Sequence, residues 1–446
     1  MRLAVVGGKL QGTEAAYLAG EAGYDVVLID RRPDRPAAGL AAECHVFDVT
    51  ADPVRSRELF LSCDAVLPAC EDDQTLEWLA AFVPGLGVPF LFDLDAYRVT
   101  SSKLRSNELF AALGVPRPLP WPSCGFPVVV KPSVGSGSVG VELAWSEPEL
   151  ALVRARLAAA GADVVVEEYV PGPSLSVDLV ACGGETVTLA PTWLEFDRTF
   201  DCKRVVAPVR QAALDPDSQG GGSDLIGPPV LSALDEISRR LADGVGRVEG
   251  PAAAGLCGVM DVEVMIGHGG VPKVLEIDAR LPSQTPACAY HASGVNIVQV
   301  LAETFAAGRA PAGLAAGPQA TAARRGAVYQ HVLVRHGRVE VLGEHVVGAA
   351  GPLWRCDGLW GADVVLTDGP DGRQADAPSG PVTAVGSGAD NVVPLRPRAG
   401  RQVGDSRESW VAVIMTTGET AAAARQRAAS AVERLADEHR LDVVLE

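Results

Sequence analysis

Short hydrophobic runs alternate with helically spaced segments from the first residue to about residue 93. Each run is strand-sized and largely continuous, which is typical of strands buried on both faces of a parallel sheet. The expected strands are 3–6, 26–30, 44–47, 65–68 and 90–92. A helix is expected over 14–23, after a loop that contains three glycines. We therefore predict an α/β domain over residues 1–94.

A different pattern follows, in which a helical segment leads into a small strand-rich unit. The helical segment, 95–113, ends at Gly114 with Pro116 just beyond, which is a usual helix stop. Strands are expected at 128–131, 141–144 and 164–169, and a helix at 147–160. A glycine- and serine-rich loop, 135–140, separates the first two strands. Residues 95–170 should therefore form a small α+β domain.

The remainder of the chain is expected to form a larger α+β domain, residues 171–446. Its expected strands are 175–181, 186–195, a hairpin within 260–280, 410–416 and 442–445, and its expected helices are 231–245 and 420–439, with mixed loop and helix over 284–307. Two segments, 215–224 and 368–405, are rich in Gly, Asp and other turn formers with hardly any hydrophobic periodicity. We predict that the first is a surface insertion and the second a disordered one.

Candidate ligand-binding groups stand at the carboxyl ends of the first domain's strands, where open parallel sheets bind ligands. The loop Gly7-Gly-Lys-Leu-Gln-Gly12 resembles a dinucleotide fingerprint but departs from its G-x-G-x-x-G spacing. A nicotinamide-dependent oxidoreductase therefore stays open as a remote alternative. The groups at this edge are Lys9, Leu10, Gln11, Asp30, Asp48, Val49 and Glu71. Their excess of carboxylates favours a ligand that carries an amine.

A lysine stands at the end of a hydrophobic strand, directly before the loop of glycine and serine. This lysine is Lys131, and the loop includes Ser136 and Ser138. Backbone amides of such a loop can approach phosphate oxygens closely, and the lysine can neutralise them. The lysine precedes the glycines, so the motif is not a P-loop. A plain glycine hairpin is the alternative, and we favour a flexible lid over a nucleotide.

The strand that ends in Glu167, Glu168, Tyr169 and Val170 runs into a turn at Pro171-Gly172. We expect the backbone of Glu167 and Val170 to grip an adenine ring, and Lys103 to reach the phosphates from a second side. A nucleotide would then lie between two small sheets.

Acidic side chains gather on the hairpin of 260–280. Glu263 lies in its first strand, and Glu276, Asp278 and Arg280 alternate along the second, so all four can share one face. Like charges at this spacing repel unless a cation neutralises them, and oxygen ligands alone suit Mg2+ held together with phosphates. We predict a magnesium site at Glu263, Glu276 and Asp278. A solvated face of the hairpin is the alternative.

Composition narrows the class of protein. With 446 residues, of which 48% are hydrophobic, the chain should form two or three domains. The net charge of -18 argues against nucleic acid as a partner. Hydrophobic runs are strand-sized and no signal peptide is recognised, so we expect a soluble cytoplasmic protein that does not enter a membrane. A homodimer is left open.

The nine cysteines include no Cys-x-x-Cys pair. They are expected to be free thiols in a reducing compartment rather than a disulfide frame or zinc site. Cys202 lies in the loop Phe200-Asp-Cys-Lys-Arg204, where basic neighbours could lower its pKa. We expect it to pack or to line a substrate rather than to be a nucleophile.

The order of these motifs resembles the ATP-grasp superfamily of carboxylate-amine ligases, over roughly residues 1 to 340 and the final strand and helix. Within the superfamily the similarity is strongest to enzymes that join an ornithine-like diamino acid to lysine, through segments such as Val6-Gly-Gly-Lys-Leu-Gln-Gly12 and Ile277-Asp-Ala-Arg-Leu-Pro-Ser-Gln-Thr-Pro286. The resemblance implies an N-terminal Rossmann-like domain (1–94), a central lid (95–170) and a C-terminal ATP-grasp domain (171–446). It implies ATP and Mg2+ as cofactors.

The resemblance also implies a reaction and a set of residues. ATP would phosphorylate one carboxylate, and the amine of lysine would attack the acyl phosphate, with Lys131 and Arg280 stabilising negative charge. The implied ATP-binding set is Lys9, Asp30, Asp48, Val49, Lys103, Lys131, Ser136, Ser138, Glu167, Glu168, Tyr169 and Val170. The implied amino-acid-binding set is Leu10, Gln11, Glu71, Ser176, Asp178, Asp201, Asp278, Arg280, Ser283 and Gln284.

Two alternatives to this reaction stay open. One is a ligase of the same superfamily for another amino-acid pair, as in peptide or natural-product synthesis, and the other is the oxidoreductase.

One departure from the superfamily pattern concerns ribose, because Val170-Pro-Gly-Pro-Ser-Leu175 places no acid just after the hinge.

Overall fold

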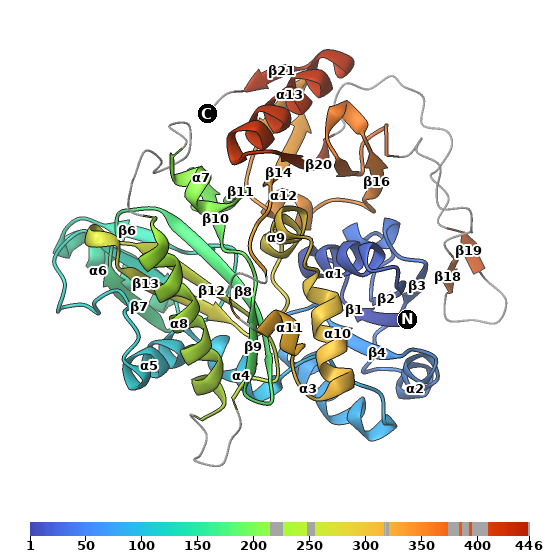
Figure 1. The fold of residues 1–446 in the computed structure, drawn as a ribbon, viewed down its shortest axis with the longest axis horizontal. Coiled ribbons are helices and arrows are strands. Elements are labelled where there is room, and N and C mark those ends of the chain that lie inside the picture. The colour runs from blue at the N-terminus through green and yellow to red at the C-terminus, as the bar shows by residue number, and fades with distance from the viewer. Residues whose placement is uncertain are drawn as a thin grey trace.

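The chain builds three β-sheets with helices packed around them (Figure 1). The computed structural model describes residues 1–214, 226–247, 255–315, 317, 321–372, 383–385, 392–394 and 409–444. The predicted surface insertion at 215–224 lies outside the described residues, as does most of the predicted disordered insertion at 368–405. The mixed α/β architecture predicted from the hydrophobic pattern is confirmed.

The N-terminal sheet has six strands in the order β19-β18-β3-β2-β1-β4, and its first four strands in the chain are parallel. These strands are β1 (Arg2–Val6), β2 (Asp25–Asp30), β3 (Glu43–Val46) and β4 (Ala65–Pro68), with α1 (Leu10–Glu21), α2 (Pro53–Leu61) and α3 (Asp73–Phe82) between and after them. The described parts of the insertion, β18 (Thr383–Val385) and β19 (Val392–Pro394), extend this sheet beyond β3. β1, β2 and β4 are buried along most of their length, as the continuous hydrophobic pattern predicted, whereas β3 is only partly buried.

Two predicted elements of this domain differ from the structure. The first helix begins at Leu10 rather than at residue 14, and inside it a Cβ at Gly12 would lie 2.1 Å from the Gly7 carbonyl oxygen. Glycine at this position therefore lets the helix start directly against the loop. The predicted strand at 90–92 forms only one bridge, Phe90 to Val66, because the Phe92 amide donates back to the Phe90 carbonyl at 2.9 Å.

The connector and the lid follow. The helical segment 95–113 is two helices, α4 (Leu94–Thr100) and α5 (Lys103–Leu113), because Ser102 caps the second by accepting from the Arg105 amide at 3.4 Å. The lid is the three-stranded sheet β6-β5-β7 with α6 (Glu147–Ala159) packed on it. Its strands are β5 (Val128–Pro132), β6 (Glu142–Ala144) and β7 (Val164–Glu168). It lies at the left of Figure 1.

The third sheet has twelve strands and spans the C-terminal domain. Its main path is β13-β12-β8-β10-β11-β14-β20-β17-β16, with β9 on β8, β15 on β14 and β21 on β15. The bounds of its strands are β8 (Ser174–Cys182), β9 (Glu185–Thr188), β10 (Thr192–Phe196), β11 (Cys202–Ala207), β12 (Gly258–Ile266), β13 (Pro272–Asp278), β14 (Gly326–Arg335), β15 (Arg338–Val341), β16 (Trp354–Asp357), β17 (Val364–Thr367), β20 (Trp410–Gly418) and β21 (Asp442–Val444).

Helices cover this sheet and connect it to the first domain. They are α7 (Val209–Leu214), α8 (Pro228–Gly244), α9 (Thr285–Ser293), α10 (Ile297–Ala307), α11 (Ala312–Ala315), α12 (His345–Gly348) and α13 (Ala421–His439). Glu14 on α1 accepts from the Ala287 amide on α9 at 2.7 Å, and Asn296 donates to the Leu18 carbonyl at 2.7 Å. The N-terminal and C-terminal domains are thus joined by buried hydrogen bonds, where α1 and α10 pack together (Figure 1).

The predicted long strand 186–195 is wrong as one element. It divides into β9 and β10, which pair with successive parts of β8. The break falls at Ala190-Pro191, since proline has no amide hydrogen to donate to the ladder.

The expectation that every cysteine is a free thiol is also wrong. Cys182 and Cys257 form a disulfide whose Cα atoms are 4.1 Å apart. They come together because β8 and β12 are antiparallel neighbours with Ala181 opposite Gly258. The other seven cysteines are free.

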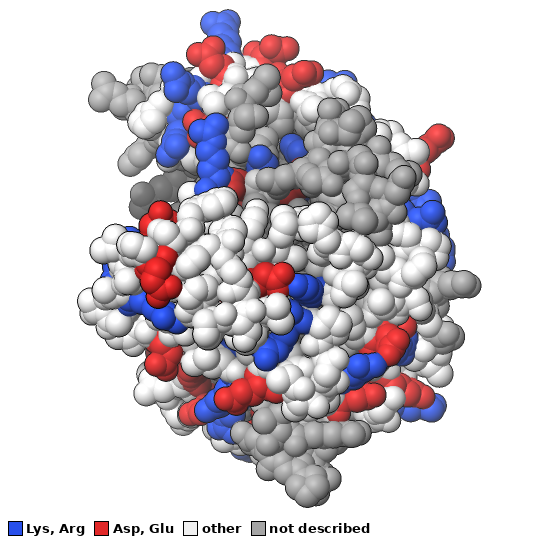
Figure 2. All heavy atoms as spheres, turned by 90° about the vertical axis from the view of Figure 1, so that its left-hand side faces the viewer, with Lys and Arg blue, Asp and Glu red and all other residues white. Residues whose placement is uncertain are grey.

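The surface of the described residues carries charges of both signs. On the lid side of the molecule, acidic and basic side chains are interspersed around a broad uncharged area (Figure 2). None of the helices in the described part of the chain combines the length and hydrophobicity that a membrane span requires.

Candidate active site

A large cavity of about 960 Å3 lies where the N-terminal sheet, the lid and the twelve-stranded sheet meet. Its lining includes thirteen acidic and six basic side chains. Because acids outnumber bases, we expect the ligands of this cavity to include cations, either metal ions or ammonium groups.

Most of the predicted site residues line this cavity. They are Lys9, Leu10, Gln11, Asp30, Asp48, Val49, Glu71, Lys103, Lys131, Ser136, Ser138, Glu167, Glu168, Tyr169, Val170, Asp201, Glu263, Glu276, Asp278, Arg280, Ser283 and Gln284. Ser176 and Asp178 do not line it, and their side chains are almost fully buried behind Asp261. Direct contact of Ser176 and Asp178 with substrate was expected from the resemblance; in the structure they lie on β8, one strand farther from the cavity than β12.

Strand register gathers the carboxylates into two rows across β8, β12 and β13. Asp178, Asp261 and Asp278 are opposite one another in one row. Ser176, Glu263 and Glu276 form the next row, two residues along each strand. We call the five acids of these rows the acidic face. Since side chains at i and i+2 share a face of a strand, all five point to the same side of the sheet.

Three basic side chains reach the carboxylates of this region. Lys103 Nζ lies 2.8 Å from Glu276 Oε1, and Arg280 Nε lies 2.8 Å from Asp278 Oδ2. Arg280 also reaches Glu71 of the N-terminal domain, with 2.7 Å between Nη2 and Oε1. Lys131 pairs with Glu167, 2.6 Å away, and donates to the Leu275 carbonyl on β13. The cations therefore connect the lid, the connector and the N-terminal domain to the hairpin.

Asp178, Asp261 and Glu263 have no cationic partner within 4.0 Å among the described residues. Burial, followed by repulsion from neighbouring acids, raises the pKa of Asp261 and of Glu263 well above the usual range. Burial also raises the pKa of Asp178 to about 8 and that of Asp278 to about 7. A proton held between close buried acids relieves their repulsion, and a bound cation would replace it.

The acidic face fits a hard cation. Its donors are all carboxylate oxygens, and Asp278 Oδ1 is buried without a hydrogen-bond partner among the described residues. Without an ion, the oxygens of Glu263, Glu276 and Asp278 do not converge within 4.8 Å of one another in the described chain. Glu276 and Asp278 are turned toward Lys103 and Arg280 instead. A metal bound at Glu263, Glu276 and Asp278 would have to draw these side chains together.

The N-terminal edge of the cavity is built by the glycine loop. Asp30 Oδ2 accepts from the Gly8 amide at 2.9 Å, and its other oxygen accepts from Arg35 Nε at 2.9 Å. Asp30 therefore holds the loop in place as well as lining the cavity. Asp48 accepts from the amide and hydroxyl of Thr50 at 2.9 and 2.8 Å. Gln11 donates to Glu71 at 3.0 Å, so Glu71 is the carboxylate of this edge that faces the hairpin.

The glycine–serine loop (135–140) closes over the cavity from the lid. Ser136 Oγ donates to Glu71 Oε2 at 2.9 Å, and Ser138 Oγ donates to the Phe200 carbonyl at 2.7 Å. Lys103 Nζ donates to the Gly135 carbonyl at 2.7 Å. Gly135 and Gly137 have φ angles of +121° and +62°, which other residues rarely adopt. The loop thus contacts the N-terminal domain, the C-terminal domain and the connector helix α5.

The hinge after β7 forms the remaining wall of the predicted nucleotide site. Glu167 is buried against Lys131, and Glu168 pairs with Lys273 at 2.6 Å. The amides of Glu168 and Tyr169 already donate to the carbonyls of Leu119 and Pro127. Tyr169 and Val170 line the cavity, so Val170 remains a candidate for gripping a base through its backbone.

The prediction from the sequence did not include two important acids. Asp261 lines the cavity beside Glu263, and alternation along β12 could have identified it. Glu344 accepts from Ser283 Oγ at 2.5 Å and Gln284 Nε2 at 2.7 Å, and its pKa is raised by burial. No sequence signal marks Glu344, because its segment meets Ser283 only in the tertiary structure.

Gln284 and Cys202 lie on the same wall. Gln284 has a φ of +71°, and its Oε1 is buried without a hydrogen-bond partner among the described residues. Such an acceptor suits an ammonium donor. The expectation that basic neighbours lower the pKa of Cys202 is wrong, since burial raises its pKa well above the usual value. Cys202 lines the cavity, and a raised pKa keeps a thiol in its less nucleophilic neutral form.

Comparisons with known proteins agree with this geometry. The family model described as D-ala D-ala ligase C-terminus matches residues 121–200. Among solved structures, the chain is similar to an L-amino acid ligase from Bacillus licheniformis, with a TM-score of 0.61, 15% identity and coverage of 100% of this chain and 98% of that one. It is also similar to an ADP complex of purK, N5-carboxyaminoimidazole ribonucleotide synthetase, with a TM-score of 0.62, 15% identity and coverage of 98% and 97%. These structures establish the ATP-grasp fold.

Curated sequences are more similar. The chain is 33% identical to 3-methyl-D-ornithine--L-lysine ligase of Methanosarcina acetivorans over 83% of this chain and 90% of that protein. It is 36% identical to the enzyme of the same name from Methanosarcina barkeri over 69% of this chain and 74% of that protein. The chain therefore belongs to the 3-methyl-D-ornithine--L-lysine ligase family of ATP-grasp enzymes.

Proposed function

We propose that this protein uses ATP to join the carboxylate of 3-methyl-D-ornithine to the ε-amine of L-lysine, a step of pyrrolysine biosynthesis. The observation that carries the proposal is the acidic face, four of whose acids line the cavity, two of them, Asp261 and Glu263, without a cationic partner among the described residues. Two diamino acids bring ammonium groups to such a cavity, whereas neutral amino acids bring fewer. Membership of the family supports the same substrates.

We assign ATP to the space between the lid and the twelve-stranded sheet. Tyr169 and Val170 would contact the base, and Lys103 and Lys131 would approach the phosphates beneath the glycine–serine loop. Solved structures of the same fold contain ADP or its magnesium salt. Glu263, Glu276 and Asp278 would hold Mg2+, which supplies charge neutralisation for phosphate oxygens.

The first chemical step transfers the γ-phosphoryl group of ATP to the ornithine carboxylate and releases ADP. Arg280, whose guanidinium pairs with Asp278 and Glu71, would orient the reacting carboxylate and offset negative charge on the oxygens of the transferred phosphoryl group. Ser283, Gln284 and Asp201 would position this substrate. Asp261, supported from behind by Ser176 and Asp178, would accept one of its ammonium groups.

In the second step the lysine amine attacks the acyl carbon, phosphate leaves, and an amide remains. We place lysine at the N-terminal edge, against Leu10, Gln11 and Glu71. Its ε-ammonium must lose a proton before it attacks. The closed loop keeps water away from the acyl phosphate meanwhile, so that the amine is the nucleophile.

The test is direct. Purified protein with ATP, Mg2+, lysine and 3-methyl-D-ornithine or D-ornithine should release ADP, phosphate and one amide per ADP, measured by mass spectrometry and a coupled phosphate assay. Omission of lysine is the control and should abolish the amide. Formation of AMP and pyrophosphate, or no amide with any diamino acid, would refute the proposal. A preference for neutral amino acids would instead assign the chain to another amino-acid pair.

We also propose that the protein acts as a homodimer, as one solved enzyme of similar fold is described as a dimer. Light scattering should then give twice the mass of the chain, and a monomeric mass would refute this.

A further inference from the structure

One turn of the C-terminal domain receives the glycine–serine loop. It connects β10 to β11 and consists of residues 197–201, and the Phe200 carbonyl in it accepts from Ser138 Oγ at 2.7 Å. Phe200 and Ser138 have φ angles of +63° and +57°, in the left-handed region that non-glycine residues seldom occupy. Such conformations persist only where surrounding contacts hold them.

Asp197 holds the turn from within. Its Oδ1 accepts from the Thr199 amide at 2.8 Å, the Thr199 hydroxyl at 2.6 Å and the Asp201 amide at 3.1 Å. Burial acts to raise the pKa of Asp197, but these hydrogen bonds outweigh it and lower the pKa, so the carboxylate is charged. The charged acceptor fixes the backbone that precedes and follows Phe200.

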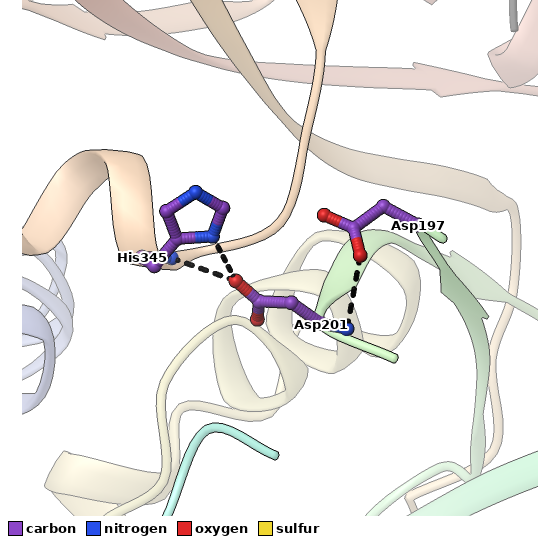
Figure 3. Close-up of side chains that lie close together, drawn as sticks. All are labelled: Asp197, Asp201 and His345. Carbon is purple, nitrogen blue, oxygen red and sulfur yellow. Dashed lines mark hydrogen bonds and ion pairs between the residues drawn. The ribbon is translucent and has the colours of Figure 1, made fainter. Parts of the chain in front are cut away.

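The segment Gly343-Glu344-His345 holds the same turn from outside. The Gly343 amide donates to Asp197 Oδ2 at 3.1 Å, and the His345 amide donates to Asp201 Oδ2 at 3.1 Å. The His345 ring is also hydrogen-bonded to Asp201 (Figure 3). A Cβ at position 343 would lie 2.2 Å from the Asp201 side chain, so only glycine permits this approach. Glu344, between them, contacts Ser283 and Gln284 on the substrate wall.

Asp197, Asp201 and His345 could also be considered as metal ligands, because one ligand atom of each lies within 4.8 Å of the others. Both oxygens of Asp197, however, already accept hydrogen bonds from the turn and from the Gly343 amide, and Asp201 Oδ2 accepts from His345. This pattern satisfies the carboxylates without an ion. The hydrogen bonds of Asp197, Asp201 and His345 therefore stabilise the conformation of the turn 197–201.

We propose that the turn 197–201 is the docking point of the closed glycine–serine loop, and that Asp197, Asp201 and His345 are positioning residues that hold the Phe200 carbonyl for Ser138. Through Glu344, the same segment ties loop docking to the wall that we assign to the ornithine-like substrate. This inference rests on the proposed ligase reaction. Its consequence concerns water: when the loop is undocked, water attacks the acyl phosphate and returns free acid and phosphate, so ADP forms without amide.

The readout is the ratio of amide formed to ADP released. A variant that only misfolds lowers both products equally and leaves the ratio unchanged. Asp197→Asn, His345→Ala and Ser138→Ala should each lower the ratio by roughly fivefold, the effect of one lost hydrogen bond on loop closure. The double variant Ser138→Ala/Asp197→Asn should lose no more than either single variant, because both remove the same contact.

A matched control is provided by a second Asp–His pair, in which Asp371 lies 2.7 Å from His439 on α13. Asp371→Asn removes the carboxylate of this pair, far from the glycine–serine loop in the chain. It should leave the ratio unchanged. Unchanged ratios in Asp197→Asn and Ser138→Ala, with wild-type protein forming amide, would overturn this inference and leave the proposed function standing. Stoichiometric zinc in the purified protein that His345→Ala loses would overturn it in favour of a metal site. Failure of the wild-type protein to form any amide would instead count against the proposed function.

Discussion

The buried pair of Lys131 and Glu167 allows a quantitative prediction. The two charged atoms are 2.6 Å apart, and only 7% and 4% of the side chains are exposed. At an effective dielectric constant of about 20, the attraction between unit charges at this distance is about 6 kcal/mol. Much of this offsets the cost of removing both charges from water, so the pair adds little net stability. Removal of one partner, however, leaves the other charge buried and unpaired.

Lys131→Met preserves most of the side-chain volume and removes the charge. It should lower the free energy of unfolding of the lid by about 3–5 kcal/mol. The double variant Lys131→Met/Glu167→Leu should recover most of this loss, since no unpaired charge remains. Both variants should lose ATP binding, because the ammonium that approaches the phosphates is gone.

Native-state hydrogen exchange of the β5 and β7 amides measures the stability of the lid directly, and isothermal calorimetry measures ATP binding. The control is Arg156→Met on the same lid, which removes an exposed ion pair with Glu142 and should cost at most about 1 kcal/mol. If Lys131→Met costs no more than Arg156→Met, the pair is not desolvated in solution, and the reasoning from burial is refuted.

Three further predictions concern the metal site, pH and the disulfide. Glu276→Gln should abolish amide formation while circular dichroism stays unchanged, because a carboxylate that we assign to Mg2+ is lost; turnover retained at saturating Mg2+ would show that the assignment is wrong. Burial raises the pKa of Glu14 to about 8, above its value in the unfolded chain, so stability should be full at low pH and fall as pH rises toward 8, by up to about 1.4 kcal/mol per pH unit. Urea titrations across this range should show a smaller slope in Glu14→Gln, and an equal slope would contradict the burial argument. Cys182→Ala/Cys257→Ala removes a disulfide that spans a 75-residue separation and should lower the unfolding free energy by about 2–4 kcal/mol in denaturant titrations, with no further loss in reductant. Cys44→Ala, which removes a free thiol and keeps the disulfide, should lose stability in reductant as the wild-type protein does.

Local sequence was sufficient for most elements of this fold. Continuous hydrophobic runs identified β1 to β4, and Gly114 marked the end of α5. Errors arose where one residue overrode the local pattern: Pro191 divided a predicted strand, and Ser102 began a second helix. The shared face of Glu263 and Glu276 was also predictable, since period-two alternation along a strand sets which side chains share a face.

How deeply each side chain is buried, and which side chains it contacts, depended on the tertiary structure. Asp178 was expected to touch substrate, but it lies behind Asp261 because β8 is the inner neighbour of β12 in the sheet. Glu344 reaches Ser283, and Cys182 reaches Cys257, across long separations in the chain. Hydrophobic alternation determines which face a residue occupies, because that depends on the backbone alone. Which strand lies beside which, and therefore which charges are buried and paired, is determined only when distant segments pack together.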